Sequence, residues 1–93
     1  MNNSRQEDFA LETRVAIIGI IVENEDSVLR IQEQLSKYSE YIIGRMGIPY
    51  RERNIRVISI AIDAPMDIIN ALTGKIGRLD GVSAKAVYQK SID

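Results

Sequence analysis

Two segments, RVAIIGIIV at residues 14–22 and IRVISIAID at residues 55–63, restrict the fold of this chain more than any other feature. Both are rich in β-branched residues, and both carry apolar side chains at odd and at even positions. A strand with one solvated face alternates apolar and polar residues, so these segments predict strands that are covered on both faces. Strands of this kind belong in the middle of a sheet.

Two further segments have the spacing of amphipathic helices. Residues 24–38, NEDSVLRIQEQLSKY, predict a helix with Asn24 as its N-cap. A second helix is predicted to open at residues 64–67, APMD, and to end at Asp80-Gly81. The expected buried stripes are Val28, Ile31, Leu35 and Tyr38 in the first helix, and Ile68, Leu72, Ile76 and Leu79 in the second.

The outer strands are predicted at residues 41–48, YIIGRMGI, and at residues 82–89, VSAKAVYQ, with PYRERN at 49–54 as a turn. The resulting order βαββαβ predicts a ferredoxin-like α+β sandwich, in which two helices cover one face of a four-stranded antiparallel sheet. That topology places the first and third strands in the centre. Residues 1–12 are mostly polar and predict a flexible arm, which leaves residues 13–93 as the single domain.

The sheet face away from the helices is predicted to be apolar. Its expected members are Val15, Ile17, Gly19 and Ile21 on the first strand and Val57, Ser59 and Ala61 on the third. Monomers rarely expose such a patch, and the small residues would let a second sheet approach closely. We therefore expect a homo-oligomer that assembles through this face or through a strand edge. The alternative is that residues 1–12 cover the face.

The chain lacks the side chains on which most catalytic and metal sites depend. It contains no His and no Cys, which removes thiolate nucleophiles, zinc-thiolate sites and a side chain that titrates near neutral pH. We therefore expect no enzymatic activity, no cofactor and no metal. Glu23, Glu25 and Asp26 could bind a hard cation, but their spacing fits no calcium loop, and solvated charges at a helix start are the favoured explanation.

Charge and hydropathy argue against nucleic-acid and membrane partners. The formal net charge is −1, whereas a nucleic-acid binder concentrates Lys and Arg. The RNA-recognition module shares the βαββαβ order, but residues 56–61 of the predicted third strand lack its aromatic stacking residues. The longest apolar run, residues 15–22, is too short to span a bilayer, and the start of the chain resembles no signal peptide. The expected location is the cytoplasm.

The strongest candidate binding site lies in the segment GRMGIPYRER, residues 44–53, which interrupts a strand pattern with glycines and arginines. Gly44 and Gly47 indicate β-bulges or a close backbone approach. Arg45 lies between them, where it can hold a carboxylate or contact a partner subunit. Three further arginines follow it, namely Arg51, Arg53 and Arg56. The alternative is an edge strand that is bent by bulges and followed by a solvated turn.

The runs IIGRMGIPYRERNIRVISI and ALTGKIGRLDGVSAKAVYQK also carry a family resemblance, which extends over residues 14–90. The chain resembles small proteins proposed to regulate iron-only hydrogenase systems, which look like the ACT-type ligand-sensing domain and the regulatory domain of the nickel-responsive repressor. The resemblance implies a role in transcriptional or metabolic regulation. Nickel sensing does not carry over, because the repressor's metal site uses His and Cys. The ACT-type ligand site near the first strand-to-helix turn usually contains Gly, whereas this chain has Glu23-Asn24-Glu25.

Two functional hypotheses follow. The first is a non-enzymatic, oligomeric regulatory module that senses a small ligand, or binds a protein partner, at subunit junctions. Its candidate ligand-binding residues are Asn24, Gly44, Arg45, Gly47 and Arg56. The second is a structural or assembly subunit without a ligand, whose glycines only shape the sheet. A direct DNA binder is the weakest alternative, because the chain has no net positive charge.

Overall fold

The computed structural model describes residues 12–90. The predicted arm, residues 1–12, therefore lies outside the described residues except for Glu12. The elements are β1 Arg14–Val22, α2 Val28–Lys37, β2 Ile42–Tyr50, β3 Ile55–Ala64, α3 Met66–Gly77 and β4 Val82–Tyr88, with short 3-10 turns η1 Glu25–Ser27, η2 Ser39–Tyr41 and η3 Arg51–Arg53. This is the predicted βαββαβ order.

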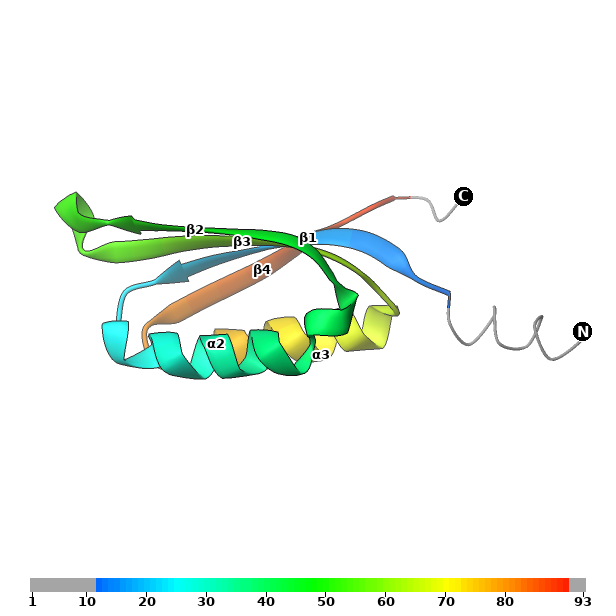
Figure 1. The fold of residues 1–93 in the computed structure, drawn as a ribbon, viewed down its shortest axis with the longest axis horizontal. Helices are drawn as coiled ribbons and strands as arrows, with labels where there is room; N and C mark the ends of the chain where they lie inside the picture. The colour runs from blue at the N-terminus through cyan, green and yellow to red at the C-terminus, as the bar shows by residue number, and fades with distance from the viewer. Residues whose placement is uncertain (1–11, 91–93) are drawn as a thin grey trace, which may run out of the picture.

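The four strands form one antiparallel sheet in the order β2-β3-β1-β4. Both helices lie on the same side of this sheet, and the β2–β3 hairpin extends past them at one end (Figure 1). The fold is therefore the predicted ferredoxin-like α+β sandwich. The first and third strands are the central pair, as their two apolar faces indicated.

The strand register assigns the side chains to two faces. Ile18 lies opposite Ile60 and Ile20 opposite Ile58, and all four are buried beneath the helices. The positions between them, such as Ile17, point to the other side of the sheet. The helices complete the core with Ile31, Leu35, Ile69, Leu72 and Ile76, all fully buried. The assignment of the two faces from the sequence is confirmed.

The turn between β1 and α2 is tied to the turn before β4. Asn24 caps the first turn as predicted, accepting a hydrogen bond from the Asp26 backbone N–H at 3.0 Å. Its amide nitrogen also donates to Asp80 at 2.7 Å. Gly81 has a φ of +70, and a Cβ added there would lie 2.6 Å from the Asn24 Cβ. Glycine is therefore required at 81 both by conformation and by space.

The helix over residues 24–38 begins differently from the prediction. Residues Glu25–Ser27 form a 3-10 turn, and the α-helix starts only at Val28. The Ser27 hydroxyl donates a hydrogen bond to the Asp80 carbonyl at 2.6 Å, and Ser27 is buried. Short 3-10 segments are common at helix N-termini. Here the 3-10 turn contacts Asp80, in the turn that precedes β4. Sequence periodicity does not reveal this contact.

The β2–β3 hairpin is longer than the sequence predicted. Pro49 and Tyr50 belong to β2 rather than to the turn, since they pair with Arg56 and Ile55. The turn itself is η3, and it ends at Asn54, which adopts the left-handed conformation with φ 56. Proline is tolerated because β2 is an edge strand, where a missing N–H donor need not break the ladder.

Candidate functional site

A groove lies between the β2–β3 hairpin and helix α2, on the helix side of the sheet. Three of the predicted site residues, Arg45, Gly47 and Arg56, line one cavity of about 220 Å³ there. Arg45 lies opposite the buried Ile60 and Gly47 opposite the buried Ile58, so both positions face the helix layer. The alternation along β2 therefore explains how residues two apart reach the same groove.

Gly47 lines the cavity without placing a side chain in it. A Cβ added at this position would meet only the Ile58 side chain, at 4.0 Å, which is an ordinary van der Waals contact. The β2–β3 pairing is regular at Gly47, whereas the register shift lies between Ile42 and Gly44. A bulge was therefore correctly predicted near Gly44 but does not occur at Gly47.

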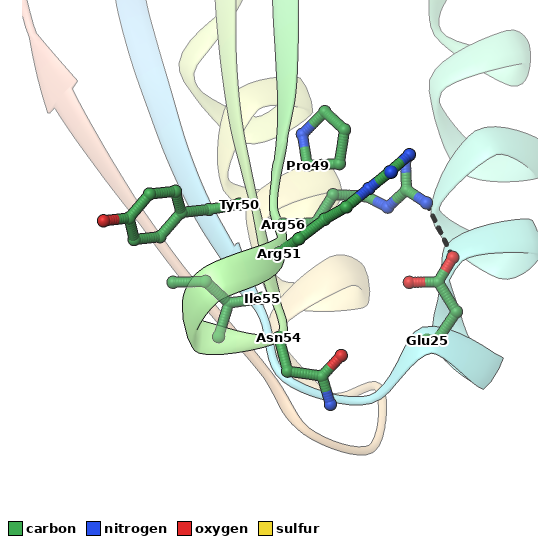
Figure 2. Close-up of a pocket in the computed structure, with 7 residues that line it drawn as sticks. All are labelled: Glu25, Pro49, Tyr50, Arg51, Asn54, Ile55 and Arg56. Atoms are coloured by element: carbon green, nitrogen blue, oxygen red, sulfur yellow. Dashed lines mark hydrogen bonds and ion pairs between the residues drawn. The ribbon is translucent and has the colours of Figure 1, made fainter.

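Arg56 forms the link between this cavity and a second one. Its terminal nitrogen donates to the Glu25 carboxylate at 2.6 Å, which joins β3 to the start of the helix layer. The second cavity, of about 640 Å³, is lined by Glu25, Pro49, Tyr50, Arg51, Asn54, Ile55 and Arg56. Figure 2 shows Arg51 and Arg56 extending toward α2, while the Tyr50 ring points the other way. The two cavities share Arg56, and we refer to them together as the groove.

The positive charge in the groove exceeds the negative charge among the described residues that line it. Three arginines, Arg45, Arg51 and Arg56, face one carboxylate, that of Glu25. Arg45 donates to the side-chain oxygen of Gln32 at 2.6 Å, a neutral acceptor. The groove therefore has the electrostatic character of an anion site.

The other two candidate residues lie elsewhere. Asn24 is at the β1–α2 turn, where its side chain caps η1 and bonds to Asp80. Gly44 lines a shallow hollow of about 300 Å³ that also includes Ser59 and Ala61, on the face away from the helices. The structure thus brings together Arg45, Gly47 and Arg56, but neither Asn24 nor Gly44 joins them in the groove.

Sequence reasoning missed the contribution of α2 to this groove. Gln32 lies beside the buried stripe of the helix, next to Ile31, and its side chain reaches Arg45. A polar residue that flanks an apolar stripe is a weak signal, because many such residues only face solvent. Glu25 was considered as a cation ligand, whereas the structure pairs it with Arg56.

The open face of the sheet is the second feature of interest. Seven of the large exposed hydrophobic residues of the described chain lie on it, namely Val15, Ile17, Ile21, Met46, Ile48, Tyr50 and Val87. Val57, Ser59 and Ala61 lie between them and are half-buried, while Gly19 is exposed. Within residues 12–90 no helix or loop covers this face (Figure 1). The predicted apolar surface is therefore present and wider than predicted.

Residues 12–90 contain no group of three acidic, His or Cys side chains arranged to hold a metal ion. Partial burial and the neighbouring carboxylate of Glu40 raise the pKa of Tyr41 above its ordinary value of 10.0. That phenol therefore stays protonated at neutral pH. None of the described helices is long and apolar enough to cross a bilayer.

These features define a class: a small ferredoxin-like domain with a basic groove on one side of its sheet and an apolar face on the other. The family model TM1266-like, described as "Iron-only hydrogenase system regulator, putative", matches residues 14–86. The solved structure of the uncharacterized protein TM1266 from Thermotoga maritima is similar, with a TM-score of 0.81 and 38% identity, over 85% of this chain and 100% of that one. No curated protein matches. The chain belongs to the TM1266-like family, as its resemblance indicated.

Proposed function

We propose that the chain is a non-enzymatic regulatory module of an iron-only hydrogenase system, which self-associates and senses a small ligand at its subunit junctions. The family description supports the regulatory part of this proposal. The expected cytoplasmic location belongs to the same proposal. The observation that carries it is the uncovered apolar face, because a stable monomer rarely exposes so many neighbouring apolar side chains.

Self-association through this face has a clear driving force. Each Å² of apolar surface removed from water contributes about 25 cal/mol before the costs of association are subtracted. Gly19, Ser59 and Ala61 in the middle of the face present little side chain, so a second sheet can approach closely. The surrounding Ile17, Ile21 and other large residues then supply the buried area.

Strand β2 connects this face to the basic groove. Arg45 and Met46 both line the groove, and both also line the hollow on the open face. A ligand that reorients either side chain would therefore alter the surface through which copies associate. This arrangement gives ligand binding a physical route to the oligomeric state, as a regulator requires.

Analytical ultracentrifugation tests the proposal. The chain should sediment as an oligomer at micromolar concentration, and Ile17→Glu should dissociate it, because a carboxylate would be buried between the sheets. Leu29→Glu is the matched control, since Leu29 is 68% exposed on α2, away from this face. A chain beginning at Thr13 shows whether residues 1–12 cover the face instead. A single-copy particle for this shortened chain would overturn the proposal.

A purely structural role is the second candidate, and one observation favours it. Arg45 and Arg56 already have partners within the chain, Gln32 and Glu25. In that case the groove only ties the hairpin to α2, and Arg45→Ala would leave ligand response unchanged. A thermal-shift screen with amino acids and small anions separates the two roles, because a ligand that binds the folded state raises Tm.

A further inference from the structure

We propose that the groove beneath the β2–β3 hairpin binds a small molecule with two acidic groups, and that Glu25 is its built-in competitor. One acidic group replaces the Glu25 carboxylate on Arg56, and the other replaces Gln32 on Arg45. The inference rests on the ligand-sensing part of the proposed function, and it adds the chemical class of the ligand and the way in which it enters.

The Arg56 guanidinium has hydrogen-bonding capacity that its contact with Glu25 does not fill. Its terminal nitrogen bonds to one oxygen of Glu25, while its Nε is buried and meets no acceptor among the described residues. A guanidinium normally offers parallel N–H groups to the two oxygens of one carboxylate. A ligand acid group that reaches both nitrogens would satisfy the Nε donor that Glu25 leaves unpaired.

Glu25 is a weak occupant of this position. Its side chain is 72% exposed, against 31% for Arg56, so much of its charge is solvated and its ion pair is screened by water. It also belongs to the short turn η1 rather than to the sheet. Replacing this pair therefore costs little, and the displaced carboxylate returns to solvent.

Arg45 provides the second anchor. Its present partner is the neutral side-chain oxygen of Gln32, at 2.6 Å. A carboxylate carries the negative charge that the amide lacks and can accept two parallel N–H bonds from a guanidinium, so an acid group should displace the amide. Gln32 would remain beside the ligand, where its amide nitrogen can donate. Since Arg45 and Arg56 line the same cavity, one molecule can reach both.

The size of the cavity limits the ligand. A volume of about 220 Å³ corresponds to about seven waters at roughly 30 Å³ each, which suits a four-carbon diacid. Arg51 lines the wider part of the groove and adds positive charge there. Once Glu25 is displaced, three arginines line the groove, and a monoacid would supply only one negative charge. A second acid group therefore improves the charge balance.

Isothermal titration calorimetry on the full chain tests the inference with a matched series. Succinate should bind, its monoamide succinamate at least about tenfold more weakly, and the neutral succinamide not measurably, because each amide removes one charged contact. Inorganic phosphate and pyrophosphate form a second arm. If pyrophosphate binds more tightly than succinate while phosphate binds weakly, the two acid groups are phosphates and the inference stands.

Variants identify the groove as the site. Arg56→Gln and Arg45→Gln should each weaken succinate binding by about tenfold or more, whereas Arg30→Gln, an exposed position on α2 outside both cavities, should not. Glu25→Gln should tighten binding by about threefold, the worth of an exposed ion pair. Glu52→Gln is its charge-matched control at the hairpin turn and should have no effect. Circular dichroism confirms that each variant folds.

Three results would overturn the inference. The first is the absence of binding by any of the diacids or phosphates at millimolar concentration. The second is unchanged or weaker binding in Glu25→Gln, which would mean that Glu25 does not compete for Arg56. The third is equal effects of Arg30→Gln and Arg56→Gln, which would reduce the effect to net charge. Sedimentation of the same samples tests the proposed self-association independently of diacid binding. Self-association can fail while diacid binding persists, and diacid binding can fail while self-association persists.

Discussion

The two faces of the central strands have similar composition but opposite surroundings. Ile18 is completely buried beneath the helices, whereas its neighbour Ile17 on the same strand is 45% exposed. Both are β-branched, and both lie opposite a residue of β3 at regular register. The difference shows that the two helices of this fold suffice to cover one side of a sheet whose two sides are both apolar. The uncovered side is therefore the surface through which we propose that copies of the chain associate.

Truncation of neighbouring isoleucines should show this contrast most strongly. Ile18→Ala should lower the free energy of unfolding by about 3 kcal/mol, because it leaves a cavity in a fully packed region. Ile17→Ala should cost less than about 1 kcal/mol at concentrations where single copies dominate, since it leaves no cavity. Urea unfolding of both variants measures the difference. Equal losses that do not depend on concentration would show that the open face is covered within one chain.

The next test concerns the turn that fixes the helix layer to the sheet. Gly81→Ala should lower the free energy of unfolding by about 2 kcal/mol, because Gly81 has φ +70 and an added Cβ would lie 2.6 Å from Asn24. Gly47→Ala is the control, since an added Cβ there meets only Ile58, at 4.0 Å. Thermal unfolding compares the two variants. A loss in Gly47→Ala as large as that in Gly81→Ala would contradict the geometry.

Asn24 tests the cap of the same turn. Asn24→Ala should lower the free energy of unfolding by about 1 kcal/mol, because it removes the acceptor for the Asp26 N–H and the donor to Asp80. Chemical unfolding measures this loss. Succinate binding by the folded variant should stay normal, since Asn24 lies outside the groove. Loss of binding with normal folding would return Asn24 to the site.

The smallest effect on stability is expected for the ion pair between Glu25 and Arg56. Glu25→Gln should lower the free energy of unfolding by about 0.5 kcal/mol or less, because the pair with Arg56 is exposed on the Glu25 side. The loss should shrink further in high salt. Unfolding at two ionic strengths measures it. A loss of several kcal/mol would mean that the ion pair is a structural tie rather than a displaceable contact.

Much of the fold could be predicted because its signals are local. The apolar side chains at both odd and even positions of β1 and β3 identified the central strands, their buried side chains and the apolar open face, and the helical stripes identified α2 and α3. The hairpin was less predictable. Pro49 and Asn54 carry turn signals, and Asn54 does end the turn, yet Pro49 lies in β2 because an edge strand tolerates proline.

The candidate site was predicted only in part. Arg45, Gly47 and Arg56 converge because a strand alternates and a hairpin brings its two arms together, which the sequence pattern allowed us to expect. Gly44 lies on the other face because strand side chains alternate, and Gly44 is the immediate neighbour of Arg45 and three positions from Gly47. The Asn24 side chain instead donates a hydrogen bond to Asp80, which ties two turns of the fold together. Asp80 is distant along the chain, so sequence pattern could not reveal this contact.

The order of residues along this chain dictated its strands, its helices, their sequence of connection and the two apolar faces of the central strands. These features depend on periodicity and on neighbours a few positions away. The pairing of Arg56 with Glu25, of Arg45 with Gln32 and of Asn24 with Asp80 came from packing, because each contact joins segments that meet only when the helices settle on the sheet. The same packing left the face opposite the helices uncovered.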